Sequence, residues 1–172
     1  MIHLYYGKGK GKTTAAMGLA LRAVAAGNGL CIVQFLKNKM SGEIKILSAL
    51  PGVKVFLGKG SNNFYSSMSD SEKKETYKIH NRNLISALSL VKAGLVQTLV
   101  LDELCAAWNH NLIEPRLLKD LFSCVPENLE LVITGREPCS LFFFMADYIT
   151  QMNLIRHPFV DKQIPAREGV EF

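Results

Sequence analysis

Short apolar runs alternate with longer helical patterns along most of the chain. Six of these runs have about five to seven residues each, which is the usual length of a strand. Runs that are apolar almost throughout are typical of strands buried on both faces of a sheet. The pattern therefore predicts six buried strands, at residues 2–6, 30–35, 53–57, 98–103, 129–134 and 148–152.

Two helices between these runs have clear boundaries. Residues 12–26 are rich in Ala, Leu and Met and end before Gly27, a residue type that commonly terminates helices. The longest helix is predicted to begin near Ser69, because Ser69 and Glu72 have the S-x-x-E spacing of a capping box. We expect this helix to end near Lys92.

The order of these elements predicts the fold class. Strand, helix and strand in repeated succession imply parallel pairing through right-handed crossovers. We predict an α/β fold with three layers and a mainly parallel central sheet of about six strands, in a single domain of residues 1–172. Two segments lack these patterns: residues 58–69 are predicted to form a loop, and residues 157–172 an extended surface segment.

The composition fits a domain that binds an anion. With 172 residues and 48% hydrophobic content the chain can bury a sizeable core, and its net charge of +5 suits a nucleotide or a nucleic acid equally. The four cysteines form no C-x-x-C pair, which favours reduced thiols over disulfides or zinc ligands. The chain has no basic leader and no apolar run of the roughly 18 to 20 residues that cross a membrane. We therefore expect a cytoplasmic protein.

The sequence YYGKGKGKTTAA, from Tyr5 to Ala16, lies between the first strand and the first helix, as a phosphate-binding loop requires. Glycines in such a loop let consecutive backbone N–H groups surround phosphate oxygens, a lysine reaches the terminal phosphates, and a hydroxyl binds magnesium. Here these roles fall to Gly7, Gly9, Gly11, Lys12 and Thr13.

The loop departs in one respect from the common G-x-x-x-x-G-K-[ST] pattern. That pattern places its first glycine where Tyr6 stands, so the first glycine here comes one position late. Lys8 and Lys10 add positive charge beside a triphosphate, or they are simply solvated loop lysines.

Polar side chains follow three further strands. Asp102 and Glu103 end the strand TLVLDE, and such acids either orient magnesium in phosphate-loop proteins or cap the following helix. Arg136 follows the strand LELVIT, where it contacts phosphate or ribose, or is solvated. Gln34 and Lys37 occupy a comparable position after the second strand. All of these lie at the edge where parallel strands place their carboxyl ends, next to the phosphate loop.

The chain resembles the ATP:cob(I)alamin adenosyltransferases, also called corrinoid adenosyltransferases, over nearly its whole length. The motifs that carry the resemblance occur in the family's order: GKGKGKTTAA, VQFLK, LDEL, ITGREP, ADYIT and RHPFVDKQIPAREGVEF. The late first glycine is the family's own form of the loop. The resemblance implies a RecA-like fold, a homodimer, and transfer of the adenosyl group of ATP to a reduced corrinoid, with magnesium and with a reductase, such as a flavoprotein, that supplies cobalt(I).

The resemblance also implies roles for particular residues. Lys12 and Glu103 are expected to be catalytic, Thr13 and Glu103 to hold magnesium, and Asp102 to support the metal through an intervening group. ATP is expected to contact Gly7, Lys8, Gly9, Lys10, Gly11, Lys12, Thr13, Thr14 and Arg136.

Three features depart from the family. Lys8 stands where asparagine is common, and Asn38 stands where glycine is common. A phenylalanine and a tryptophan that cover the lower face of the corrin ring in the family are absent from the loop after Gly58. Phe64 and Tyr65 are the nearest aromatic residues, so they are the candidates for corrinoid contact here.

Two other functions remain open on the sequence alone. A small-molecule kinase or ATPase shares the phosphate loop and the acidic strand, with Asp102 as its base, and would release ADP instead of triphosphate. A non-catalytic RecA-like module that binds nucleic acid would suit the positive charge. The basic residues are scattered, however, and do not alternate with aromatic residues, so we predict no nucleic-acid partner and no membrane partner.

Overall fold

The computed structural model describes residues 1–170, and its centre is a six-stranded sheet whose strand pairs are all parallel. The order across the sheet is β3-β2-β4-β5-β1-β6. The strands are β1 (Ile2–Tyr6), β2 (Leu30–Gln34), β3 (Val53–Leu57), β4 (Thr98–Asp102), β5 (Glu130–Gly135) and β6 (Tyr148–Gln151). The predicted six-stranded sheet is confirmed, with small differences at the strand ends. The expectation that every strand is buried is wrong for β6, whose four residues are all exposed because β6 lies at the edge of the sheet.

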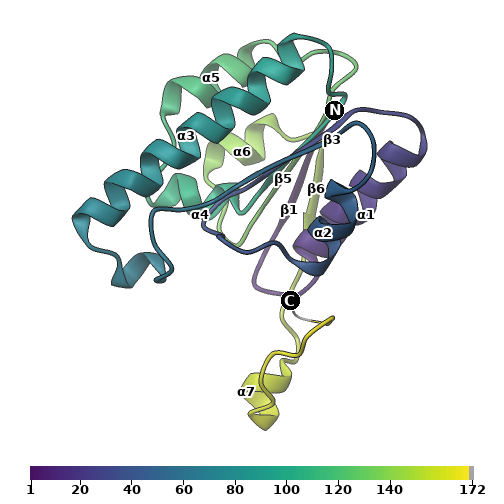
Figure 1. Ribbon diagram of the computed structural model, residues 1–172. Helices are drawn as coiled ribbons and strands as arrows, with labels where there is room; N and C mark the ends of the chain where they lie inside the picture. The colour runs from purple at the N-terminus through teal and green to yellow at the C-terminus, as the bar shows by residue number, and fades with distance from the viewer. Residues whose placement is uncertain (171–172) are drawn as a thin grey trace.

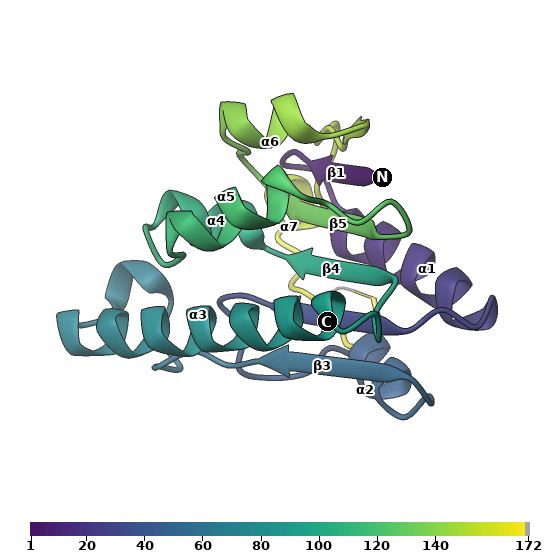
Figure 2. The ribbon, with the colours of Figure 1, turned by 90° about the horizontal axis from the view of Figure 1, so that it is seen from above.

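Helices cover both faces of this sheet. One face carries α1 (Lys12–Ala25) and α2 (Gly42–Ser48), as Figures 1 and 2 show. The other face carries α3 (Asp70–Lys92), α4 (Leu104–Asn109), α5 (Pro115–Ser123) and α6 (Ser140–Met145). The predicted three-layer α/β architecture is therefore confirmed.

A separate apolar core fills each gap between sheet and helices. The core beneath α1 and α2 contains Ala16, Met17, Ile32 and Val100, among other buried residues. The larger core on the opposite face joins alternate residues of the same strands, such as Val33 and Leu101, to the other helices. Because neighbouring residues of an inner strand enter different cores, the inner strands must be apolar on both sides, which explains their continuous apolar runs in the sequence.

The capping box at the start of α3 forms as predicted. Ser69 Oγ accepts a hydrogen bond from the backbone N–H of Glu72, and the Glu72 carboxylate accepts from the backbone N–H of Ser69 at 2.7 Å. These bonds satisfy two of the backbone donors that a helix start leaves free. They also fix the end of the loop that precedes α3, which includes a short 3₁₀ helix at Tyr65–Ser67.

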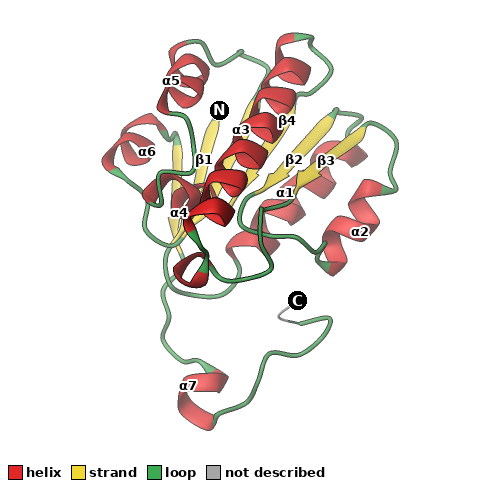
Figure 3. Cartoon of the chain, turned by 60° about the vertical axis from the view of Figure 1, so that its left-hand side comes forward, coloured by secondary structure: helices red, strands yellow, loops and turns green. Residues whose placement is uncertain are grey.

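The C-terminal segment differs in part from the prediction. It is exposed, but Pro158–Lys162 form a short helix, α7, where an extended chain was expected. Pro158 is the first helical residue, and His157 Nδ1 accepts the N–H of Phe159 at 3.2 Å, so local capping explains the helix. Figures 1 and 3 show α7 below the sheet, away from the other helices. The last two residues of the predicted segment, 171 and 172, lie outside the described residues.

Among residues 1–170, no helix has the length and apolar character needed to cross a lipid bilayer.

Candidate active site

The phosphate loop connects β1 to α1 and is supported from below by the chain that leaves β6. Gly7 and Gly11 both have a φ of 113°, a left-handed conformation that favours glycine. The N–H of Gly9 donates to the carbonyl of Met152 at 2.8 Å, and the N–H of Met152 donates to Tyr6 at 2.7 Å. A side chain at position 9 would come within 2.7 Å of the Met152 carbonyl oxygen. Close backbone packing therefore requires glycine at this position.

Lys12 lies inside the loop that it follows. Its side chain is buried, and its ammonium donates a hydrogen bond of 2.8 Å to the carbonyl oxygen of Gly9. Burial lowers the pKa of Lys12, and nearby Arg136 lowers it further, while the carboxylate of Glu103 opposes the shift. The lysine is thus held at the place where the sequence predicts the terminal phosphates.

Asp102 is the most highly connected polar side chain of the site, and it is completely buried. Its Oδ1 accepts hydrogen bonds from the hydroxyls of Thr13 at 2.9 Å and Thr134 at 2.8 Å. Its Oδ2 accepts from Gln34 Nε2 at 2.9 Å and from Lys37 Nζ at 2.8 Å. Three segments that are distant in sequence therefore converge on one carboxylate.

The pKa of Asp102 is determined by competition between burial and these partners. Burial raises the pKa, but the charge and hydrogen bond of Lys37, with the hydrogen bonds of Thr134 and Gln34, bring it below its ordinary value. Asp102 is therefore an ionised carboxylate with a weak affinity for protons.

Glu103 is adjacent in sequence but has a different environment. Its φ of 61° turns the chain sharply between β4 and α4, and its N–H donates to Thr134 Oγ1 at 2.9 Å. Burial and the neighbouring charge of Asp102 raise the pKa of Glu103, which Lys37 and Lys12 partly offset. Glu103 occupies the capping position of α4, but its side chain makes no capping hydrogen bond. The helix-capping alternative is therefore wrong for Glu103.

A cavity of about 490 Å³ lies beside these residues. The predicted residues among its lining are Lys10, Gly11, Lys12, Thr13, Thr14, Glu103 and Arg136. Lys37 also lines it. Three residues predicted for ATP are not part of the lining: Lys8 is exposed, and the N–H groups of Gly7 and Gly9 donate to the carbonyls of Gly135 and Met152. The structure thus brings together most of the residues predicted for ATP, at the carboxyl ends of β1, β2, β4 and β5.

The cavity also has a wall that the sequence did not indicate. It consists of Ser41, Gly42, Glu43 and Ile46 at the start of α2, and of Gly169 and Val170 near the end of the chain. No motif marks these residues, because their position depends on how α2 and the C-terminal segment pack against the sheet. The segment after α7 therefore returns to the phosphate loop (Figure 1).

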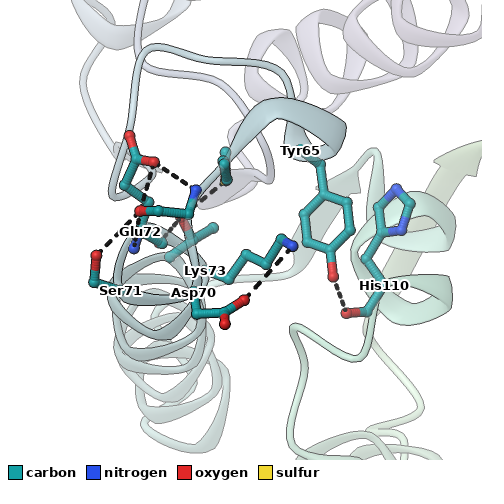
Figure 4. A network of polar contacts seen from close by, with 9 residues as sticks. Tyr65, Asp70, Ser71, Glu72, Lys73 and His110 are labelled. Carbon is teal, nitrogen blue, oxygen red and sulfur yellow. Dashed lines mark hydrogen bonds and ion pairs between the residues drawn. The ribbon is translucent and has the colours of Figure 1, made fainter.

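The two candidate corrinoid residues have different surroundings, although both line a second cavity of about 290 Å³. The ring of Tyr65 stacks on His110 with 3.8 Å between ring centroids, and its hydroxyl donates to the His110 carbonyl at 3.3 Å (Figure 4). The ammonium of Lys73 lies 5.4 Å from the centre of the Tyr65 ring. Phe64, in contrast, is 84% exposed. Tyr65 is anchored, and Phe64 is available for a ligand.

Residues 36–38 lie between the two cavities. Leu36 lines the cavity near Tyr65, and Lys37 lines the cavity beside the phosphate loop. Asn38 holds the loop after β3: its Oδ1 accepts the N–H of Lys59 at 2.6 Å, and its Nδ2 donates to the carbonyl of Ser61 at 2.8 Å. A glycine at position 38 would lack both bonds. The departure from the family at Asn38 therefore has a structural role in this chain.

Comparison with known proteins places this arrangement in a family. The family model described as ATP:corrinoid adenosyltransferase BtuR/CobO/CobP matches residues 1–172. The chain belongs to the ATP:corrinoid adenosyltransferase family. The resemblance that the sequence motifs indicated is confirmed.

Individual relatives agree with this assignment. Corrinoid adenosyltransferases of a Sinorhizobium species and of Pseudomonas aeruginosa are 30% and 31% identical to the chain, over 96% and 98% of its length and 77% and 82% of theirs. Corrinoid adenosyltransferase CobA of Salmonella typhimurium is 24% identical over 100% of the chain and 85% of its own length.

A solved structure shows the fold. The KaiC-like protein PH0186 of Pyrococcus horikoshii aligns with a TM-score of 0.53 over 91% of this chain and 73% of its own, at 18% identity. The RecA-like, phosphate-loop fold implied by the resemblance is therefore confirmed.

Proposed function

We propose that this chain transfers the 5′-deoxyadenosyl group of ATP to the cobalt(I) of a corrinoid. Cobalt(I) supplies the electron pair that forms the cobalt–carbon bond at C5′ of the ribose, the C5′–oxygen bond breaks, and triphosphate leaves with its electrons. No proton has to be removed, so a general base is not needed. The observation that carries the proposal is a cavity lined by Lys10, Lys12, Lys37 and Arg136, in a chain of this family. Two residues of its lining, Thr13 and Lys37, contact the ionised, fully hydrogen-bonded Asp102.

The cations of the cavity bind the triphosphate. Lys10, Lys12 and Arg136 line the cavity, and the backbone at Gly11, where the loop meets α1, supplies N–H groups. Because negative charge develops on the leaving triphosphate, these groups stabilise the transition state more than the ground state. Lys12 exchanges its hydrogen bond with Gly9 for one with a phosphate oxygen, which requires only rotations of its own side chain.

The residues around Thr13 fit a magnesium ion. Magnesium takes oxygen ligands in octahedral geometry, keeps several waters and is usually bound through one or two carboxylates and substrate phosphates. The hydroxyl of Thr13 donates a hydrogen bond to Asp102, so the lone pairs of the Thr13 oxygen stay available for a metal ion. Glu103 lines the same cavity and supplies a carboxylate oxygen, while Asp102 orients the Thr13 hydroxyl. When bound, the metal neutralises charge on the triphosphate.

The corrinoid is assigned to the cavity beside Phe64 and Tyr65. This cavity adjoins the nucleotide cavity through Leu36 and Lys37, so a ring bound there lies next to the nucleoside. The exposed ring of Phe64 offers apolar area to the corrin face, and Tyr65 is fixed by His110. Aromatic side chains suit this task because they fill area with little loss of rotamer entropy.

The remaining parts of the proposal concern the assembly and its surroundings. We expect one domain of residues 1–172, a homodimer, a flavoprotein or similar reductase as the source of cobalt(I), and a cytoplasmic location. The edge strand β6 supports the dimer, because Tyr148 and Ile149 are exposed along an unpaired strand edge, with Phe144 exposed in the adjacent helix α6. Exposed apolar side chains along an edge favour association with another chain.

One experiment tests the reaction and separates it from a kinase. The protein is incubated without oxygen with ATP, magnesium and chemically reduced cobalamin, and the visible spectrum is followed for adenosylcobalamin. We expect the spectrum to change in proportion to the triphosphate released. Formation of ADP without a cobalt–carbon bond would instead support a kinase or ATPase. The lowered pKa of Asp102 argues against that alternative, because it makes Asp102 a poor base for a hydroxyl acceptor.

A further inference from the structure

Every hydrogen-bonding position of the Asp102 carboxylate is occupied in this structure. An ionised carboxylate has about four lone-pair sites, two on each oxygen. Thr13 and Thr134 fill those of Oδ1, and Gln34 and Lys37 fill those of Oδ2. A metal ion, or a water bound to it, therefore reaches Asp102 only if one of these four partners leaves.

Of these four partners, Lys37 is the one whose side chain can move away from Asp102 most easily. The side chains of Gln34 and Thr134 are completely buried in the sheet, and Thr13 is itself an expected metal ligand. The Lys37 side chain is 33% exposed, lines the nucleotide cavity and has a flexible four-carbon stem. A divalent cation beside Thr13 would also repel the Lys37 ammonium, which lies 2.8 Å from Asp102.

A second observation, at Gln34, also indicates that a ligand binds near Asp102. Gln34 donates its amide N–H to Asp102, but its amide oxygen, Oε1, is buried without a hydrogen-bond partner among residues 1–170. An unpaired buried acceptor is costly, and such groups call for an explanation. A donor is therefore missing at Oε1 of Gln34, whose Nε2 contacts Oδ2 of Asp102, and a water bound to a metal is a donor of the required kind.

The backbone around Lys37 is fixed, so its side chain alone can move. Leu36 has a φ of 58°, and its N–H donates to Nε2 of the buried His80 at 3.1 Å. The carbonyl of Lys37 accepts the N–H of Gly58 at 2.9 Å, and Phe35 N–H donates to the Asp102 carbonyl at 3.0 Å. These bonds place the start of the Lys37 side chain at the rim of the cavity, whichever partner its ammonium contacts.

We propose that Lys37 is a place-holding cation that changes partners during substrate binding. Without nucleotide, its ammonium neutralises Asp102. When a triphosphate and a divalent cation enter, the ammonium moves to a phosphate oxygen, and Oδ2 of Asp102 and Oε1 of Gln34 become available to water on the metal. Lys37 is then a third triphosphate-binding lysine, in addition to Lys10 and Lys12. The inference rests on the metal site of the proposed function.

If Lys37 changes partners in this way, replacing it should raise the affinity for a metal ion and lower the affinity for a triphosphate. In Lys37→Met, the competitor at Asp102 is gone, so nucleotide-free protein should bind Mn²⁺ about tenfold more tightly or better, measured by the electron paramagnetic resonance of free Mn²⁺. The same variant should bind inorganic tripolyphosphate at least about tenfold more weakly in titration calorimetry, because it lacks one charged contact. Lys39→Met removes a nearby exposed lysine and is the matched control, with both affinities unchanged.

Two further variants separate the effect of the Lys37 charge from an effect on folding. Lys37→Arg keeps the charge and should resemble the unchanged protein in both titrations. If Lys37→Met does not fold, Lys37→Gln removes the charge while keeping a donor for Asp102, and the same opposite effects are expected with smaller size. Thermal melting shows which variants are folded.

The contradicting results are equally definite. Unchanged Mn²⁺ affinity in the folded Lys37→Met or Lys37→Gln protein, or a decrease in the affinities for both ligands, would overturn the exchange. These titrations contain no corrinoid and no ATP chemistry. Opposite effects in a protein that forms no adenosylcobalamin would therefore support the role of Lys37 while contradicting the proposed reaction.

Discussion

The hydroxyl of Thr13 donates a hydrogen bond of 2.9 Å to Oδ1 of Asp102, across 89 positions of sequence. This single bond joins the phosphate loop to the acidic end of β4. It also fixes the direction of the Thr13 lone pairs, because the hydroxyl proton is committed to the carboxylate. The metal site of the proposed function depends on this orientation as much as on the identity of the ligands.

Lys12→Ala should lower the rate of adenosyl transfer at least about a hundredfold, because it removes one preorganised charge from the leaving triphosphate. The rate of adenosylcobalamin formation with chemically reduced cobalamin measures the effect. Lys54→Ala, which changes an exposed lysine of the edge strand β3, should keep the normal rate. A Lys12→Ala protein with near-normal activity would show that the lysine does not act on the triphosphate.

Glu103→Gln should raise the magnesium concentration needed for half-maximal activity, because an amide oxygen carries no charge for the metal. The shift is measured by titrating magnesium at saturating ATP, with circular dichroism to confirm folding. Glu43→Gln changes a carboxylate at another wall of the same cavity and should leave the titration unchanged. If both variants behave alike, Glu103 has no special role at the metal.

Phe64→Ala and Tyr65→Ala should have different effects, because their surroundings differ. Phe64→Ala removes an exposed ring and should leave stability unchanged, but should slow adenosylation that starts from cobalt(II) more than adenosylation from cobalt(I). The expected reason is that the Phe64 ring covers the lower face of the corrin and keeps the lower ligand away from the cobalt. Cobalt(II) without that ligand is more easily reduced to cobalt(I). Equal slowing in both assays, or none, would show that Phe64 does not control cobalt coordination.

Tyr65→Ala should also lower the free energy of unfolding, by about 1 kcal/mol, because it loses the stacking on His110. Urea denaturation measures this change. Tyr65→Phe keeps the ring and should retain most of the stability, which separates the stacking from the weak hydroxyl contact at 3.3 Å. A Tyr65→Ala protein as stable as the unchanged chain would mean that the stack does not anchor the loop.

His80 should make stability increase with pH between about pH 4 and pH 6.5. Burial, with a smaller contribution from Lys59, lowers the pKa of His80 from 6.5 to about 4 in the folded protein. The unfolded chain therefore binds a proton in this range while the folded chain does not, so unfolding becomes less favourable as pH rises. Integrated over the range, the effect is at most about 3 kcal/mol.

The pH effect can be isolated with His80→Gln, which keeps an acceptor for the N–H of Leu36 but does not titrate in this range. The difference in unfolding free energy between the two proteins is measured in urea at several pH values. It should change with pH below about pH 7 and stay constant above it. Parallel curves from pH 4 to pH 7 would exclude the protonation of His80 as the cause.

Much of this structure follows from local sequence. The inner strands were predicted because both of their faces enter a core, and Ser69 with Glu72 correctly marked the start of α3. The phosphate loop was found because its glycines, lysine and threonine are adjacent in sequence. In each case the signal lies within about ten residues, where backbone geometry leaves few alternatives.

The rest depends on contacts between distant segments, which no local pattern carries. The partners of Asp102 come from β2, β5 and the phosphate loop, so its full set of hydrogen bonds appears only in the folded chain. Gln34 and Lys37 were noticed at the right edge of the sheet, but nothing in VQFLK indicates that both contact Asp102. The wall contributed by α2 and Val170 was missed for the same reason.

The position of residues 36–38 between the two cavities has a thermodynamic consequence. Leu36 and Lys37 are consecutive residues with one shared peptide group, and each lines a different cavity. If a triphosphate draws the Lys37 ammonium away from Asp102, the charge near the other cavity changes, and with it the free energy of binding there. Linkage makes this effect reciprocal: whatever factor the triphosphate applies to corrinoid affinity, the corrinoid applies to triphosphate affinity. The two substrates of the proposed reaction would then affect each other's binding through the charge of one lysine, before any bond between them forms.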